Sequence, residues 1–154
     1  MSDSQFQFQE PGELLDGDLQ LVLLSRQVGN RDKGEVPCYQ FSMKLVSQDV
    51  EVGHIDLRVG NTHHLVTYAG HVAYDVEPEH QGHHYAARAC QLILPLARSH
   101  GLDPLWIMCR PENSASRRTC EMVGAELADI VDLPEDHNMY QRGYRQVCRY
   151  RLTL

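Results

Sequence analysis

The stretch GHVAYDVEPEHQGHHYAARAC, residues 70–90, decides the fold because it joins a strand to a helix through a short polar turn. Apolar and polar residues alternate over 70–76, which is the pattern of a half-buried strand. From Tyr85 onward the period becomes helical, and one face collects Ala86, Ala89, Cys90, Ile93 and Ala97. Gly101 supplies a helix stop. The stretch is therefore predicted to form a strand, a turn and an amphipathic helix.

The turn EPEHQGHHYA, residues 77–86, has the composition of an anion-binding junction. The first backbone N–H groups of a helix lack internal partners, and the helix dipole adds a favourable potential for an anion there. An ordinary connection between a strand and a helix has the same pattern. The turn by itself leaves both interpretations open.

The flanking sequence predicts further strands and a second helix. The strands are expected at residues 19–26, 39–43, 51–59, 105–109, 126–133 and 145–154, with an irregularity at Gly53. A shorter helix is expected at 114–122, closed by Gly124. Residues 1–18 form an acidic lead-in, and residues 27–37 a loop. This order favours a mixed α/β sheet over a doubly wound one.

Composition places the chain among soluble globular proteins. With 154 residues, 42% hydrophobic and 23% charged, we expect one domain over residues 1–154. A net charge of −7 argues against a nucleic-acid partner. No apolar run approaches the ~20 residues of a membrane span and no signal peptide is evident, so we expect a cytoplasmic protein without a membrane partner. Five cysteines without a CxxC pair favour reduced thiols.

The order of motifs resembles the GNAT superfamily of N-acetyltransferases. QGHHYA, residues 81–86, occupies the place of that family's turn of the form [QR]-x-x-G-x-[AG], and NSASRRTCEMVGAEL, residues 113–127, resembles its N-x-x-[AS] helix. The resemblance implies a GNAT-like acyl-CoA N-acyltransferase fold, with a mostly antiparallel central sheet, splayed central strands and flanking helices. It also implies transfer of an acetyl group from acetyl-CoA to a primary amine by direct attack.

The resemblance implies a set of cofactor-binding residues and no metal. Backbone groups of two strand residues are expected to pair with the pantetheine arm, namely Tyr74 and Val76. Amides of the turn are expected to wrap the pyrophosphate: Gln81, Gly82, His84, Tyr85 and Ala86. Asn113 is expected to hydrogen-bond the pantetheine or a nearby loop, and the N–H of Val76 to stabilise the oxyanion. The thioester should lie where strands 70–76 and 105–109 splay apart.

Three features depart from the family pattern. His84 replaces the second glycine of the turn, where a histidine in helical dihedrals would still fit. Cys120 stands where many members carry a tyrosine that acts as general acid; it is a candidate acid, although the pattern favours a buried cysteine that packs on the helix face. Residues 27–37 are too short for the two helices that usually roof the acceptor site. An open acceptor pocket is expected, and a homodimer partner could supply the missing wall.

A primary amine must lose a proton before it attacks. With a pKa near 10.4, neutralising it at pH 7 costs ~4.6 kcal/mol, so a positioned base is expected. His71 is the first candidate and Glu77 the second. We expect the acceptor to be a small-molecule amine or a protein N-terminal amine, and the acidic residues within 1–25 favour a cationic one.

Two other functions stay open. A histidine-rich metal-binding module is one, because His80 and His84 would share a face if their segment were helical, although Gly82 argues against a helix there. A non-catalytic acyl-CoA-binding or regulatory domain of the same fold is the other, since the departures at His84 and Cys120 affect the chemistry most directly.

Overall fold

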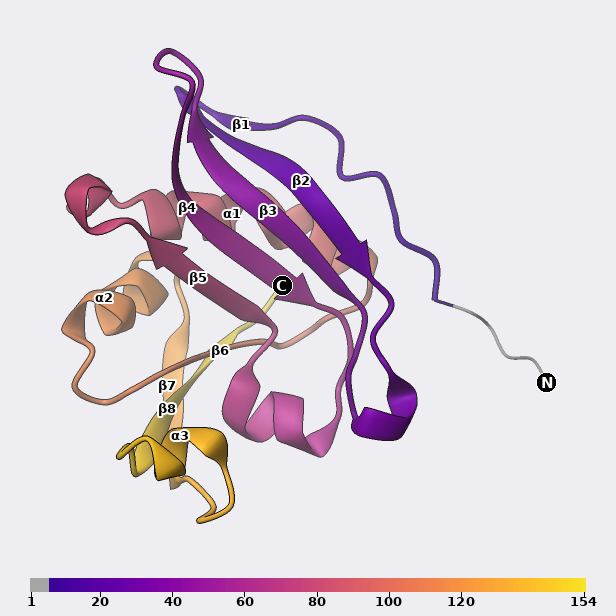
Figure 1. The fold of residues 1–154 in the computed structure, drawn as a ribbon, viewed down its shortest axis with the longest axis vertical. Coiled ribbons are helices and arrows are strands. Elements are labelled where there is room, and N and C mark those ends of the chain that lie inside the picture. Colours follow the sequence, from indigo (N-terminus) through magenta and orange to yellow (C-terminus); the bar gives the residue numbers. More distant parts are fainter. Residues whose placement is uncertain (1–5) are drawn as a thin grey trace.

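The computed structural model of the chain describes residues 6–154, which form an eight-stranded mixed sheet with flanking helices (Figure 1). The strand order is β1-β2-β3-β4-β5-β6-β8-β7. Neighbouring strands are antiparallel except for β5 and β6, which are parallel. The predicted mixed α/β fold with a mostly antiparallel sheet is confirmed.

The elements follow the predicted order along the chain. The strands are β1 (Leu14–Asp16), β2 (Leu19–Gln27), β3 (Cys38–Leu45), β4 (Val50–Arg58), β5 (Val72–Val76), β6 (Leu105–Cys109), β7 (Glu126–Asp132) and β8 (Gln146–Leu152). The α-helices are α1 (Tyr85–Ser99), α2 (Ser114–Met122) and α3 (Asn138–Gln141). Shorter helical turns are the 3₁₀ turns Arg31–Lys33 and Pro78–His80 and the π-helical turn Leu65–Ala69.

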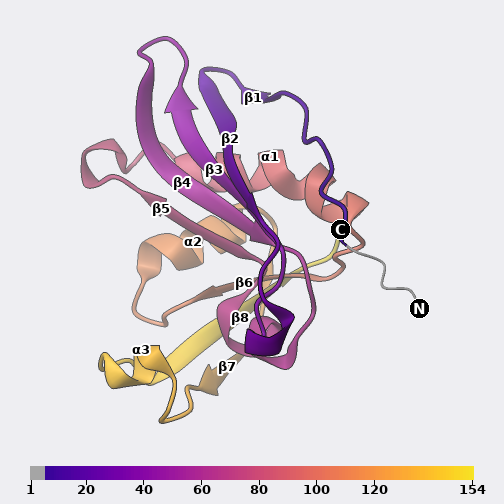
Figure 2. The same cartoon turned by 45° about the vertical axis from the view of Figure 1, so that its right-hand side comes forward.

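Helix α1 covers one face of the N-terminal half of the sheet, where it contacts β1, β2, β4 and β5 (Figure 2). Its apolar stripe buries Ala89, Ile93 and Ala97 completely against that face. Full burial of a side chain such as Ile93 contributes about 1.5–3 kcal/mol. Pro95 lies inside the helix, which nevertheless continues to Ser99 because Leu96 and Ala97 beyond the proline are buried.

The irregularity expected at Gly53 is a β-bulge between β3 and β4. Met43 pairs with Gly53 and Lys44 with Glu51, so Val52 has no partner of its own. A side chain at position 53 would collide with the carbonyl oxygen of Asp75 on β5. Glycine is needed here because the end of β5 approaches the backbone of β4 so closely.

Strands β5 and β6 pair at one point only and then diverge. Val72 opposite Ile107 is their single register pair, and the His71 N–H donates to the Trp106 carbonyl at 2.8 Å. Beyond Val72 the two strands separate, and α2 lies beside the gap (Figure 1). The predicted splay between the central strands is therefore present.

Three short elements were not signalled by the sequence. The acidic lead-in contains β1, which pairs with β2. The π-helical turn Leu65–Ala69 and α3 occupy segments expected to be loops. Between β2 and β3 the structure has only the short turn Arg31–Lys33, which agrees with the expected lack of long helices there. None of the helices within residues 6–154 is both long enough and apolar enough to cross a membrane.

His71 fastens β5 to β6 at their meeting point. The side chain is fully buried; its Nδ1 accepts the Trp106 N–H at 2.9 Å, and its Nε2 donates to the Gly60 carbonyl at 2.9 Å. Because Nδ1 is an acceptor, the ring is neutral with its proton on Nε2. Burial lowers the pKa of His71, which keeps the ring in this form.

We expect the free energy of unfolding to fall as the pH drops below about 6.5. In the unfolded chain His71 then binds a proton, whereas in the folded protein it stays neutral. The stabilisation is therefore complete above the pKa of His71 in the unfolded chain, and it is lost as the pH falls toward the lower pKa in the folded protein. Urea denaturation between pH 5 and 8 measures this slope. His71→Ala should flatten the slope and cost about 1–3 kcal/mol at pH 7.5, because the Trp106 N–H loses its acceptor. The control His83→Ala removes an exposed histidine; an equal effect there would contradict the assignment.

Candidate functional site

Two clefts meet at the gap between β5 and β6. The smaller, of about 500 Å³, lies between the end of β5, the turn that precedes α1, and α2. Every residue predicted to bind the cofactor lines it: Tyr74, Val76, Gln81, Gly82, His84, Tyr85, Ala86 and Asn113. Residues drawn from a strand, a turn and a second helix are thus brought together in one place.

Three residues shape the turn: Gln81 through its side chain, and Gly82 and His84 through left-handed backbone conformations. Gln81 Nε2 donates to the Val76 carbonyl at 3.1 Å, which ties the turn to the end of β5. Gly82 has φ +95°. The first helical hydrogen bond of α1 runs from the Arg88 N–H to the His84 carbonyl, so the amides before Arg88 have no helical acceptor. They are free to bind an anion.

His84 does not take the helical dihedrals expected for it. Its φ of 61° and ψ of 28° lie in the left-handed region, which costs a residue with a side chain roughly 1–2 kcal/mol relative to glycine. The expectation of helical dihedrals was wrong because the chain reverses direction at this residue before α1 begins. The same reversal explains why the family motif has glycine here.

The larger cleft, of about 820 Å³, lies on the other side of the gap. Its walls come from β4, β5, the end of β6, the turn Leu65–Ala69, and the loop that leads into α3. The side chains that line both clefts are Tyr74, Asn113 and Ser116. These residues mark the junction through which the two clefts communicate.

At this junction Tyr74 on β5 is hydrogen-bonded to Ser116 on α2. The Tyr74 Oη lies 2.7 Å from Ser116 Oγ, and burial raises the pKa of Tyr74, so the phenol stays protonated. Asn113 caps α2 by accepting the Ser116 N–H on Oδ1 at 3.1 Å. This cap fixes the start of α2 and leaves the Asn113 amide nitrogen able to donate to a ligand.

The predicted catalytic residues do not line either cleft. His71 is buried with both ring nitrogens hydrogen-bonded, as described above. Glu77 lies at the end of β5, where its N–H donates to the Val52 carbonyl. Cys120 is fully buried, and its contact with Cys109, together with burial, raises its pKa. The geometry favours structural positions for His71 and Cys120, and the catalytic role of Glu77 stays a prediction.

An aromatic group that sequence reasoning missed lines the larger cleft. The rings of His64 and His137 stack with their centroids 5.3 Å apart, and Tyr68 lies against both. His137 Nδ1 accepts the Met139 N–H at 3.1 Å, whereas no hydrogen bond within residues 6–154 engages the His64 ring. Burial and the neighbouring His137 lower the pKa of His64, so its ring is neutral near pH 7.

These residues carry little local signal. Ser116 is part of the N-x-x-[AS] motif and was therefore within reach of the sequence. His64 and His137 lie in segments far apart along the chain, and only the fold brings the π-helical turn against the loop before α3 (Figure 1).

Histidines do not converge on a metal in the described residues. No group of three or more His, Cys, Asp or Glu side chains within residues 6–154 is arranged to hold an ion. His80 ends a 3₁₀ turn and His84 is left-handed, so the two do not share a helix face.

Comparisons with known proteins agree with this geometry. The sequence matches the family model of the acetyltransferase (GNAT) domain over residues 7–126. A search among curated proteins found no match.

Similar solved structures are acetyltransferases at low sequence identity. A GNAT-family acetyltransferase from Bacillus anthracis has a TM-score of 0.60 and 21% identity; the match covers 74% of this chain and 65% of that protein. A candidate ribosomal-protein-serine acetyltransferase from Vibrio cholerae has a TM-score of 0.66 and 18% identity, over 95% of this chain and 100% of that protein. The microcin C7 self-immunity acetyltransferase, solved with acetyl-CoA and AMP, has a TM-score of 0.60 and 14% identity, over 76% of this chain and 61% of that protein.

The likeness to solved structures shows the fold, and this chain spans about two thirds of the Bacillus protein. The family match is independent of that likeness and covers well over half of the chain. The chain belongs to the GNAT family of acetyltransferases.

Proposed function

We propose that the protein transfers an acetyl group from acetyl-CoA to a primary amine by direct attack, as a single GNAT domain. The observation that carries this proposal is that all residues expected to bind acetyl-CoA line one cleft, which meets a second, larger cleft at Tyr74 and Ser116. The smaller cleft suits the donor and the larger cleft the acceptor.

The backbone supports this division of the clefts. Past Val72, the edge of β5 that faces β6 has no strand partner, so backbone groups near Tyr74 and Val76 are available to pair with a pantetheine arm. The amides from Gly82 to Ala86, which have no backbone acceptor within residues 6–154, would bind the pyrophosphate. The thioester would then lie at the Tyr74–Ser116 pair, with the Val76 N–H as oxyanion donor.

Proton transfer completes the proposed mechanism. The ammonium of the acceptor loses a proton to His64, directly or through water, and the amine nitrogen attacks the thioester carbonyl. The carbon–sulfur bond breaks as the intermediate collapses. The departing thiolate takes a proton from the hydroxyl pair of Tyr74 and Ser116, and the pair regains a proton from the attacking nitrogen, which thereby becomes the neutral amide. A thiol with a pKa near 8.5 needs only modest assistance at neutral pH.

Two further parts of the proposal concern the cell and the assembly. All five cysteines are free thiols, which supports a reducing, cytoplasmic location. The larger cleft borders the short π-helical turn and the loop before α3, and no long helix within residues 6–154 lines it. An open acceptor site and a homodimer that completes it stay predictions.

The function is tested by acetyl-CoA binding followed by turnover. A saturating ligand at 100 times its Kd stabilises a protein by ~2.7 kcal/mol, which raises Tm by roughly 5–10 °C for a chain of this size. We expect such a shift with acetyl-CoA and with desulfo-CoA, but none with Zn²⁺. Release of free thiol with a panel of amines then establishes the enzyme. A thermal shift without thiol release would favour the non-catalytic acyl-CoA-binding domain instead.

We expect Tyr74→Phe and Ser116→Ala each to lower kcat about 10- to 100-fold, because each removes one hydroxyl of the proton-donating pair. The KM for acetyl-CoA should change less than threefold. Tyr140→Phe is the matched control, since Tyr140 lines neither cleft. Steady-state kinetics across pH 6–9 measures the effect. An unchanged kcat in both variants would remove the pair from the mechanism.

His84→Gly should raise the stability of the protein by up to ~1 kcal/mol and tighten acetyl-CoA binding. Glycine relieves the left-handed strain and removes a Cβ from the phosphate side of the turn, although it adds entropy to the unfolded chain. His83→Gly is the matched control: residue 83 does not have positive φ, so glycine there should lower stability. Urea denaturation and calorimetric titration of acetyl-CoA distinguish the two. A loss of stability in His84→Gly equal to that in the control would be evidence against the strain.

A further inference from the structure

The larger cleft carries a charge opposite to that of the whole chain. The sequence has a net charge of −7, yet the cleft is lined by Arg58 and Arg110. Among its described lining residues the acidic side chain is Asp136, an exposed residue of the loop before α3. A cationic cleft in an anionic protein concentrates anionic ligands.

Arg58 is held in position by hydrogen bonds to backbone carbonyls, which do not neutralise its charge. Its Nη1 donates to the carbonyls of Ala69 and Gly70, both at 3.1 Å, at the end of the π-helical turn. No carboxylate in residues 6–154 forms an ion pair with it. The nearest acidic residue along β4 is Asp56, on the same strand face but beyond ion-pair distance. The other guanidinium N–H groups can therefore serve a ligand.

Arg110, at the end of β6, is also oriented by its neighbours. Its guanidinium lies 4.4 Å from the centroid of the Tyr144 ring, and the closest carboxylate contact, to Glu112, is 4.0 Å. Stacking on the ring engages the face of the guanidinium and leaves the N–H groups at its edge free. A planar donor fork of this kind fits a carboxylate or a phosphate.

The proposed donor does not account for these arginines. Its pyrophosphate would bind the turn before α1, and no residue of that turn lines the larger cleft. The pantetheine arm that reaches toward the junction is uncharged. The assignment of the larger cleft to the acceptor rests on the proposed function. With that assignment, Arg58 and Arg110 are available to recognise the acceptor.

We propose that the acceptor is an amine that also carries a carboxylate or a phosphate, and that Arg58, assisted by Arg110, binds this anionic group. The amine end of the same molecule lies toward His64 and the junction at Tyr74. Two arginines and an imidazole that line the same cleft match a molecule with a negative group and an amine.

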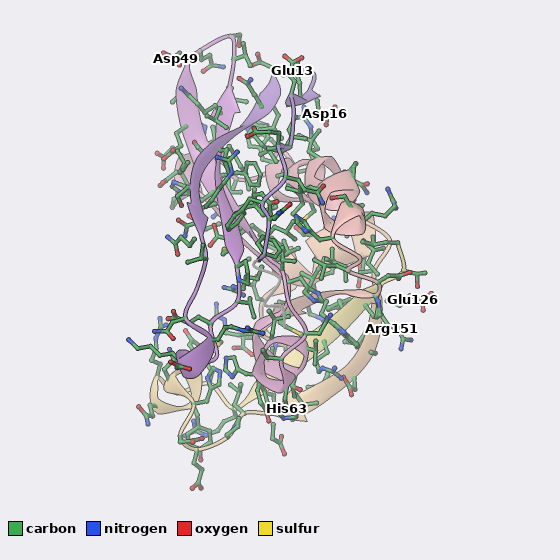
Figure 3. The ribbon with its side chains drawn as sticks, turned by 90° about the vertical axis from the view of Figure 1, so that its right-hand side faces the viewer. Glu13, Asp16, Asp49, His63, Glu126 and Arg151 are labelled. Carbon is green, nitrogen blue, oxygen red and sulfur yellow. The ribbon has the colours of Figure 1, made fainter. Side chains whose placement is uncertain are left out.

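The acidic N-terminal stretch does not oppose this assignment. Glu10 pairs with Arg26 at 3.0 Å and Asp16 with Arg88 at 2.8 Å. Figure 3 shows Glu13 and Asp16 at the end of the molecule opposite His63, which precedes the π-helical turn of the cleft. No described residue of 6–25 lines the larger cleft, so the leaning toward a cationic acceptor has no structural support.

Matched pairs of amines test the substrate class. Thiol release at saturating acetyl-CoA is compared for β-alanine against β-alaninamide and for O-phosphoethanolamine against ethanolamine, with putrescine as the cationic amine. We expect the anionic member of at least one pair to exceed its neutral partner at least tenfold in kcat/KM, and that pair identifies carboxylate or phosphate. Equal use of both members, or preference for putrescine, overturns the proposal while the proposed acetyltransferase function stands.

A binding measurement separates failure of this proposal from failure of the proposed function. If no amine releases thiol, each pair is titrated calorimetrically into the protein saturated with CoA. Tighter binding of an anionic member, lost in Arg58→Gln, keeps the anion site while the catalytic proposal fails. Equal or absent binding of all members overturns the anion site as well.

Substitutions test which residues carry the preference. Arg58→Gln should raise KM for the anionic acceptor about 10- to 100-fold, the range for loss of a hydrogen bond to a charged group, with kcat and the neutral partner's KM within twofold. Arg110→Gln should give a smaller rise, and Asp136→Asn a two- to threefold decrease. Arg151→Gln removes the same charge from β8, next to Glu126 on β7, and should have no effect (Figure 3). An equal rise for both members of a pair in Arg58→Gln would show that the residue only shapes the turn.

Discussion

The structure depends on the single contact point between β5 and β6. Two neighbouring parallel strands normally continue their ladder, and here the ladder stops at Val72 and Ile107. His71 compensates for the missing pairs, because its buried ring bridges the Trp106 amide and the Gly60 carbonyl. One neutral imidazole thus secures the sheet at the position where the sheet opens, and both clefts exist because the ladder ends there.

The divergence of the strands places unsatisfied backbone where a ligand can use it. Open backbone edges within a protein are costly unless they are paired or solvated. At the end of β5 the other edge is secured by the bulge and by the tight approach of Gly53 to Asp75. The opposite edge is left free beside the smaller cleft. One edge of β5 is thus rigid, and the other can form hydrogen bonds with a ligand. This combination suits a backbone that binds a ligand.

The sequence was sufficient for the fold and for the lining of the smaller cleft but not for that of the larger cleft. Periodicity predicted the major strands and helices, since each buries a regular stripe, as α1 does through Ile93. Most residues that line the smaller cleft could be grouped from the sequence because they lie within two short motifs, whereas their role in cofactor binding stays a prediction. His71 was misleading: a histidine on a strand face is compatible with a base and with a buried bridge, and only three-dimensional burial distinguishes them. Arg58, His64 and His137 come from three separate segments, and no local pattern links them.

The hydrogen-bonded residues Tyr74 and Ser116 line both clefts. Molecules bound in the two clefts would therefore contact the same pair of hydroxyl groups. Any effect that occupancy of one cleft has on affinity in the other must be reciprocal, as linkage requires. Under the proposed function, donor and acceptor would meet at these two hydroxyls in one ternary complex.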